Sequence, residues 1–211
     1  LLEHPRTNRN ILLALEELSQ NWISNKLKVR EQDYPKVQSV KVREIETKDA
    51  AYVLSLRSDP NYNRHLSPVE NSIPAQELYI NSYKKQNIPS RSSYYFIIEN
   101  VLKDIPCGTV RIYNFNGLSF EWGSWILDKN KTRHAALEIA IFVYSFAFQR
   151  LGFEYSEFEV NKLNKNVLSF HIKSGAEIIS SDEQNFYFRF MRSQALEFVN
   201  RLKNIIQKNV R

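Results

Sequence analysis

The chain has few cysteines and histidines, and it has no long apolar run. Its 211 residues include one cysteine, Cys107, so an internal disulfide is excluded, and this usage fits the reducing cytoplasm. Its four histidines show no metal-ligand spacing, so no metal is expected. No apolar run is long enough to span a bilayer, and the first residues carry no signal-peptide pattern. We therefore expect a cytoplasmic protein without a membrane partner.

The charge is positive, but it is not concentrated. A net charge of +6 and a pI near 9.3 favour acidic partners. The basic residues are scattered, however, and no recognition helix, zinc-ligand spacing or RNA-binding motif accompanies them. We therefore expect a basic surface and an anionic small molecule rather than a nucleic acid.

The centre of the sequence predicts a βαβα unit. A strand over residues 118–127 is followed by a basic turn at 128–134, an apolar helix at 135–151, a second strand at 153–161 and a short helix ending at Gly175. Gly175 is expected to close that helix in the left-handed region. A helix N-terminus after a basic turn favours anions through its free N–H groups and its dipole. The alternative is a solvated basic turn with no ligand.

Two segments of this unit resemble the GNAT family of acyl-coenzyme A-dependent N-acyltransferases, particularly the branch that acetylates protein N-termini and amino sugars. Residues 146–148, Phe-Ala-Phe, are similar to a Tyr-Ala-Phe of that branch and align residues 131–136 with the family's pyrophosphate loop. Residues 164–176 resemble the family's Asn-x-x-Ala-x-x-Leu-Tyr-x-x-x-Gly-Phe, with His171 on the usual tyrosine. The resemblance covers about residues 40–191.

This resemblance implies acetyl-coenzyme A as co-substrate and a set of residues that would bind it. The loop residues would hold the diphosphate, the strand that precedes them would contribute backbone, and a later asparagine would contact the pantetheine arm. These candidates are Lys131, Thr132, Arg133, His134, Ala135 and Ala136 in the loop, Trp125, Ile126 and Leu127 in the strand, and Asn164. Asn164 is also a good helix cap, and both roles are compatible.

The loop departs from the family pattern because His134 stands where a glycine is usual. Glycine lets backbone amides approach a diphosphate without a Cβ in the way. Three outcomes follow: basic side chains take over part of the contact, coenzyme A binds weakly, or it does not bind. The last outcome would make the chain a non-catalytic interaction module on the same fold.

The strand at 118–127 carries the candidate chemistry. Gly123 in its interior suggests a bulge or a close approach to another backbone. The resemblance implies a bulge that splays this strand from its parallel neighbour and lets a strand amide polarise the thioester carbonyl. Glu121 is the candidate base that takes a proton from the amine, directly or through water. His171 is the candidate acid, because an imidazole titrates near neutral pH. The alternatives are a solvent-exposed Glu121 and a structural His171.

The acceptor has no motif of its own. Residues 56–60 are similar to the Arg-Asn-Asp-Pro ending of a helix in this branch, which makes Arg57 and Tyr62 candidate acceptor residues. The alternative is ordinary loop surface. The resemblance favours an amino sugar nucleotide of a surface-polysaccharide pathway as acceptor, and a protein or peptide N-terminus second.

We expect an α+β fold in which a mixed, mostly antiparallel sheet is splayed between its central parallel strands and flanked by helices. Residues 39–191 would form the acyltransferase domain, and residues 192–211 a C-terminal amphipathic helix. Residues 1–38 would form an N-terminal amphipathic helix and linker, as an accessory element or the tail of a preceding domain. The two terminal helices could pair within the chain, form a homodimer or dock an attached domain.

Overall fold

The protein forms a seven-stranded sheet in the order β1-β2-β3-β4-β5-β7-β6. A computed structural model describes residues 29–63 and 67–208. The strands are β1 Val40–Glu44, β2 Tyr94–Asn100, β3 Ile105–Asn116, β4 Ser119–Leu127, β5 Tyr155–Asn161, β6 Glu177–Ser181 and β7 Asn185–Met191. All neighbours pair antiparallel except β4 and β5, which are parallel. The expected mixed sheet with a central parallel pair is therefore confirmed.

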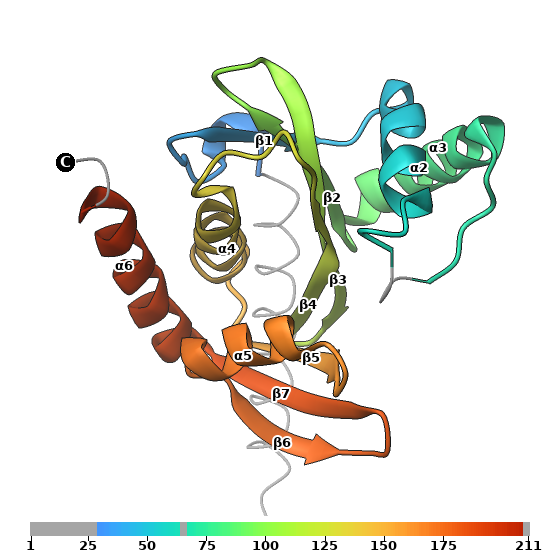
Figure 1. Ribbon diagram of the computed structural model, residues 1–211. Coiled ribbons are helices and arrows are strands. Elements are labelled where there is room, and N and C mark those ends of the chain that lie inside the picture. Colours follow the sequence, from blue (N-terminus) through green and yellow to red (C-terminus); the bar gives the residue numbers. More distant parts are fainter. Residues whose placement is uncertain (1–28, 64–66, 209–211) are drawn as a thin grey trace, which may run out of the picture.

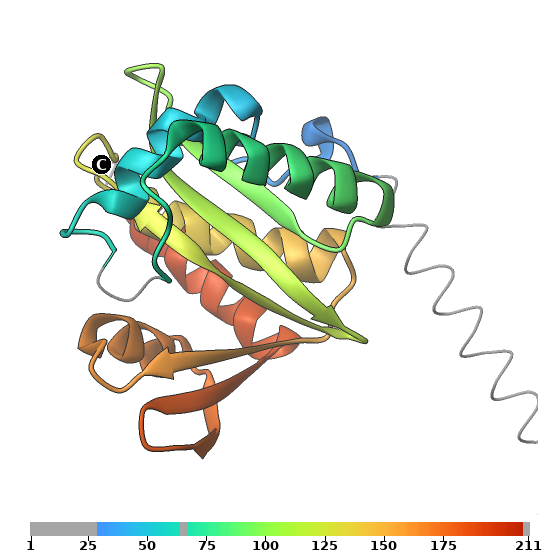
Figure 2. The ribbon, with the colours of Figure 1, turned by 90° about the vertical axis from the view of Figure 1, so that its right-hand side faces the viewer.

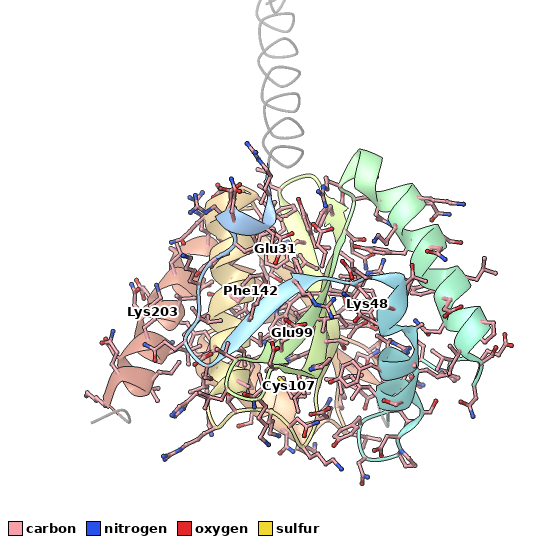
Figure 3. All side chains as sticks on the ribbon, turned by 90° about the horizontal axis from the view of Figure 1, so that it is seen from above. Glu31, Lys48, Glu99, Cys107, Phe142 and Lys203 are labelled. Carbon is pink, nitrogen blue, oxygen red and sulfur yellow. The ribbon has the colours of Figure 1, made fainter. Side chains whose placement is uncertain are left out.

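Helices cover both faces of the sheet (Figures 1 and 3). Helices α4 (Ala135–Ser145) and α6 (Arg192–Lys208) lie on one face, and α2 (Ala50–Ser58) and α3 (Ile73–Ser90) lie on the other. Helix α5 (Lys165–Ser174) follows β5 and packs against β5 and α6. Short 3-10 turns at Glu31–Asp33 and Thr47–Asp49 flank β1.

The larger core lies between the sheet and α4 with α6, and aromatic rings fill it. Phe96 of β2 meets Phe142 of α4 edge-to-face, with ring centroids 5.3 Å apart, and Phe142 stacks on Phe146 at 5.7 Å. Figure 3 labels Phe142 in this layer. Because α4 is apolar on all sides, nearly every residue in it is buried. This rigid layer fixes the position of the α4 N-terminus.

A smaller core lies on the opposite face, under α2 and α3. It contains Ile45, Val53, Ile80, Tyr95 and Ile97. Strand β2 contributes to both cores, which explains its continuous apolar run instead of an alternating pattern.

The predicted helix over residues 135–151 changes character before its end. The α-helix stops at Ser145, and Phe146–Arg150 forms a π turn in which the Leu151 amide donates to the Phe146 carbonyl at 3.0 Å. The prediction of one continuous α-helix is therefore wrong in its last turn, because such a turn has no distinct hydrophobic period in the sequence.

The apolar face of α6 is used inside the domain. Its buried residues Ala195, Phe198, Val199, Leu202 and Ile206 join the larger core, and the helix packs along α4. Of the three partners left open for this helix, the structure places an intramolecular one. The N-terminal helix expected in residues 1–38 falls mainly outside the described residues. Among the helices that the structure describes, none is both long and apolar enough to cross a bilayer.

Candidate active site

Strands β4 and β5 share only the start of a parallel ladder. They pair at Ser119 with Tyr155 and at Phe120 with Ser156, and no further pairs follow. Figure 2 shows the two strands diverging from this shared end, with the loop before α4 and the helix α5 on either side of the opening. The backbones of β4 and β5 therefore separate beyond their two paired positions.

Strand β4 carries the expected bulge, but the bulge begins at Ser124, one residue after Gly123. Its register against β3 shifts between Arg111 paired with Gly123 and Thr109 paired with Ile126. Ser124 has the positive φ, 47°, and its carbonyl accepts a hydrogen bond from the Thr109 hydroxyl at 2.9 Å. Gly123 has no positive φ, so its lack of a side chain serves another purpose, which we derive below.

Aromatic side chains line the α5 side of the opening. The indole of Trp125 lies 5.0 Å from the ring of Trp122 and 5.9 Å from that of Phe170 on α5. Its Nε1 is buried and has no hydrogen-bond partner in the described part of the chain. The Trp125 side chain therefore contacts this region directly, whereas the sequence predicted a backbone contribution alone. Ile126 is buried, and the half-buried Leu127 pairs with Gly108.

His171 is buried among aromatic rings and stays uncharged at neutral pH. Its imidazole lies 4.2 Å from the ring of Phe158 and 6.1 Å from that of Trp122, measured between centroids. Burial lowers the pKa of His171 to about 3, and its Nδ1 finds no partner among the described residues. The prediction that this imidazole titrates near neutral pH is wrong. A neutral ring can donate one N–H hydrogen bond, but it has no extra proton to release.

Helix α5 begins and ends as the sequence predicts. The Asn164 side chain caps it by accepting a hydrogen bond from the Val167 amide at 3.4 Å, and Gly175 ends it with φ of 99°. The cap orients Asn164 at the start of the helix that borders the opening. Its contact with a pantetheine arm stays a prediction.

The loop between β4 and α4 is held by hydrogen bonds to α2 and β2 and by one within the loop. The Asp128 carboxylate accepts hydrogen bonds from the Asn130 amide at 2.7 Å and from the Tyr52 hydroxyl at 3.0 Å. The Asn130 carbonyl accepts from the Asn100 side chain at 2.7 Å. These contacts bind the loop to α2 and β2, so its conformation is defined by packing and hydrogen bonds without a glycine.

A buried carboxylate fixes the far side of the same loop. Glu138, in the first turn of α4, accepts hydrogen bonds from the Ser39 amide at 2.9 Å and the Val40 amide at 3.1 Å. The Ser39 hydroxyl in turn contacts the Thr132 hydroxyl at 2.6 Å. Ser39, Asp128 and Glu138 were not predicted from sequence, since their role depends on partners 76 to 99 positions away along the chain.

The end of this loop presents free backbone donors. The amides of Arg133, His134 and Ala136 have no acceptor among the described residues, and the Lys131 and Arg133 side chains are exposed. His134 has φ of −105°, and no loop residue has a positive φ. The backbone therefore needs no glycine to adopt this conformation. Free amides, a helix N-terminus and two cations together fit a diphosphate. Ala135 is fully buried beneath them.

Glu121 lies where the two strands begin to diverge. Its carboxylate accepts hydrogen bonds from the Tyr113 hydroxyl and from the Asn114 side-chain amide, each at 2.7 Å. The side chain is half-buried and lines a groove of about 420 Å³ with Glu157 and Glu159 of β5. These carboxylates make the groove acidic, which suits a cationic amine, and the role of Glu121 as a base stays a prediction.

A second cavity of about 450 Å³ lies beside this groove, under α2 and α3. It is lined by Arg57, Ser67, Pro68, Val69, Gln76, Tyr79, Tyr95, Arg111, Tyr113 and Ser124. Arg57 is a lining residue of this cavity and donates to the Ser67 carbonyl at 2.8 Å, while its contact with an acceptor stays a prediction. Tyr62 is half-buried in the turn after α2 and is not a lining residue of this cavity, so its predicted contact with acceptor has no support here.

Arg111 was missed by the sequence analysis, although a charged residue in an otherwise apolar strand was a usable signal. Its guanidinium lies 5.3 Å from the ring of Tyr83, 5.9 Å from Tyr95 and 5.5 Å from Tyr113. It also donates to the Tyr79 hydroxyl at 2.9 Å. Burial raises the pKa of Tyr83 and Tyr95 to about 12, so these phenols carry no charge at neutral pH.

Neither arginine of the cavity has a counter-charge. No carboxylate of the described residues forms an ion pair with Arg57 or Arg111, and the Nε atoms of both are buried without a partner. Both arginines are half-buried, and a guanidinium at a cavity wall without a carboxylate partner can pair with an anionic group of a ligand. The cavity is therefore suited to a phosphate or carboxylate group.

Comparisons with known proteins agree with this geometry. A solved structure described as the apo form of FdhC, a nucleotide-linked sugar GNAT, is 41% identical, with a TM-score of 0.71 over 78% of this chain and 93% of that one. The spermidine N-acetyltransferase of Vibrio cholerae, solved with CoA and spermine, is 16% identical, with a TM-score of 0.62 over 75% of this chain and 98% of that one. At that identity the likeness shows the fold alone.

A GNAT acetyltransferase of Bacillus anthracis is similar in the same way, at 15% identity and a TM-score of 0.62 over 76% of this chain and 99% of that one. A comparison with curated protein sequences gives no match. The family model for the acetyltransferase (GNAT) domain matches residues 39–177. Since that match spans more than half of the sequence, the chain belongs to the GNAT acetyltransferase family.

Proposed function

We propose that this protein transfers an acetyl group from acetyl-coenzyme A to the amine of a nucleotide-linked amino sugar. The observation that carries the acceptor class is the cavity with Arg57 and Arg111, whose two guanidinium groups lack any carboxylate partner in the described chain. The diphosphate of a nucleotide-linked sugar would supply that charge. The relative that is 41% identical is described as a nucleotide-linked sugar GNAT, which supports the same class.

The same cavity argues against a polyamine acceptor. Spermidine carries several positive charges and requires carboxylates along its length, whereas the lining residues include two arginines and no acidic side chain. The acidic groove at Glu121 is separate and suits a single amine. An acceptor with one amine and one anionic end fits both surfaces.

The proposed reaction uses the groups around the opening between β4 and β5. The amine nitrogen attacks the thioester carbonyl carbon, and Glu121 takes the proton that the nitrogen loses, directly or through a water. A backbone amide of β4 after the bulge stabilises the carbonyl oxygen as it becomes negative. The C–S bond then breaks and releases the thiolate, which takes a proton from Glu121 or water.

No dedicated acid is assigned to the thiolate. A thiol of ordinary pKa near 8.5 is a workable leaving group without full protonation. Neutral His171 is placed to donate a hydrogen bond at most, because burial holds its pKa near 3. Its proposed role is therefore to shape the aromatic side of the opening with Trp125 and Phe170.

The diphosphate loop gives the first prediction. Replacing both Lys131 and Arg133 with alanine should raise the Kd for acetyl-coenzyme A about tenfold, because two exposed cations beside the free amides are lost. Calorimetric titration measures this change, and the difference should shrink at high salt. The matched control replaces Lys84 and Lys85 on α3 with alanine and should leave Kd within twofold. Equal Kd values for both double variants would contradict a diphosphate site at this loop.

The acceptor cavity gives the second prediction. Arg111→Met keeps the apolar stem of the side chain and removes its charge. We expect this variant, and Arg57→Met, to weaken UDP or dTDP binding at least tenfold in calorimetric titrations. Arg192→Met is the control, because its guanidinium forms an exposed ion pair with Glu154 at 2.9 Å, away from the cavity. Unchanged nucleotide affinity in both cavity variants would remove the nucleotide from the proposal.

A further inference from the structure

Tyr113 stands between the two surfaces that the proposed acceptor would use. This half-buried residue of β3 lines the arginine cavity, and its ring lies 5.5 Å from the Arg111 guanidinium carbon. Its hydroxyl donates to Oε1 of Glu121 at 2.7 Å. One side chain thus contacts both the anion-binding group and the candidate base.

The neighbouring residue completes the support of the carboxylate. Asn114 donates from Nδ2 to Oε2 of Glu121 at 2.7 Å, and its backbone has φ of 51°. Both oxygens of Glu121 are therefore held by consecutive residues of β3. Each oxygen keeps a second lone pair, so the carboxylate can still accept a proton.

The glycine of β4 makes room for this arrangement. A Cβ at Gly123 would lie 2.8 Å from the Tyr113 hydroxyl oxygen, and 3.5 Å from the nearest ring carbon. Real Cβ atoms do not approach an oxygen so closely, so any side chain at position 123 would push the Tyr113 hydroxyl from its place. Gly123 and Tyr113 therefore form a matched pair across the two strands.

We propose that Tyr113 is a positioning residue that fixes the Glu121 carboxylate at the strand opening and connects it to the anion-binding Arg111. The inference rests on the proposed function, because it takes Glu121 as the base and the arginine cavity as the site of the anionic end. It adds a residue that the family resemblance did not assign and a reason for the glycine in β4.

The hydrogen bond from Tyr113 holds one oxygen of the Glu121 carboxylate in place. The other charged or titratable groups of the groove are Glu157 and Glu159 of β5 and Tyr187 of β7. Glu157 forms an ion pair with Arg189, with 2.6 Å between Oε1 and Nη2. The Tyr187 hydroxyl donates a hydrogen bond to Asp182. Loss of the Tyr113 hydroxyl would leave the Glu121 carboxylate facing Glu159 with one donor fewer, so the carboxylate would be free to turn away from the strand opening.

The test is the kinetics of acetyl transfer to a nucleotide-linked amino sugar by Tyr113→Phe. We expect kcat to fall about tenfold and KM for the acceptor to stay within about twofold, because the base loses its position while the anion-binding groups stay. Tyr79→Phe is the control, because its hydroxyl contacts Arg111 but not Glu121. That variant should raise KM for the acceptor and leave kcat within about twofold of wild type.

Gly123→Ala provides a second variant that keeps the phenol. It should reproduce the fall in kcat at an unchanged KM, because its Cβ displaces the hydroxyl. A kcat within about twofold of wild type in both Tyr113→Phe and Gly123→Ala would overturn the role of Tyr113. An inactive wild type that fails to bind UDP or dTDP would instead overturn the proposed function, so the two failures are distinguishable.

Discussion

Glu121→Gln should lower kcat by a factor of at least one hundred. The substitution keeps the size of the side chain but removes the carboxylate that takes the amine proton, and a positioned general base contributes about 10²–10⁴ in rate. The two donors on β3 stay in place, one to each oxygen position of the native side chain. The effect should therefore fall on the chemical step and leave substrate affinity nearly unchanged.

The rate of thiol release measures kcat, and calorimetric titration measures the affinity for substrate. The Kd for acetyl-coenzyme A should stay within twofold in Glu121→Gln, because the loop at residues 128–134 does not involve this residue. Glu183→Gln is the control, since Glu183 is exposed in the turn between β6 and β7. A kcat within threefold of wild type in Glu121→Gln would remove Glu121 as the base.

Gly108→Ala should have the largest effect on stability. A Cβ on Gly108 would lie 2.2 Å from the backbone carbonyl oxygen of Ile126 and 2.9 Å from Cδ2 of Leu127. Because the closest atom belongs to the backbone, β3 and β4 must move apart to accept the methyl group. We expect the free energy of unfolding to fall by about 3 kcal/mol, at the upper end of overpacking costs.

Denaturant titration of Gly108→Ala against Gly117→Ala measures this effect. Gly117 has φ of 55° but no neighbouring atom within 4 Å, so its substitution carries backbone strain alone, about 1 kcal/mol. Gly108→Ala should also weaken acetyl-coenzyme A binding, because Ile126 belongs to the strand that leads into the diphosphate loop. Equal losses of stability in the two variants would contradict the close contact of β3 with β4.

The sequence predicted the parts of the fold that local patterns specify. The cap at Asn164, the left-handed Gly175 and the amphipathic α6 each depend on residues a few positions apart, and the structure confirms them. The basic turn before α4 was likewise found where expected. Such features depend on hydrogen bonds and periodicity within one segment, which the order of residues directly shows.

The acceptor cavity depends on elements that are distant in the chain. Arg57 comes from α2, Tyr79 from α3 and Arg111 from β3, so no local pattern marks them as neighbours. The protonation of His171 was mispredicted for a related reason, since its low pKa is due to burial among rings such as Phe158 of β5. Burial of this kind arises only when the sheet and α5 are assembled.

The glycine-free loop shows the limit of an argument from motif alone. The substitution at His134 suggested an obstructed diphosphate site, yet the backbone there has ordinary negative φ and free amides. The contacts of Asp128 and Glu138 fix that conformation from outside the motif. The backbone geometry thus removes one reason to expect a weakened site, and coenzyme A binding at this loop stays a prediction that the Lys131 and Arg133 double variant tests.

The most direct test of the account compares the rates of acetyl transfer from acetyl-coenzyme A to matched acceptors. The rate is measured from the release of the coenzyme A thiol. The acceptors are a UDP-linked or dTDP-linked amino sugar, the same amino sugar without its nucleotide, a peptide N-terminus and spermidine. The account predicts a kcat/KM for the nucleotide-linked sugar at least a hundredfold above that for the free sugar, because two anion-binding arginines contribute to binding. Equal rates for the linked and free sugars, or a preference for spermidine or the peptide, would contradict it.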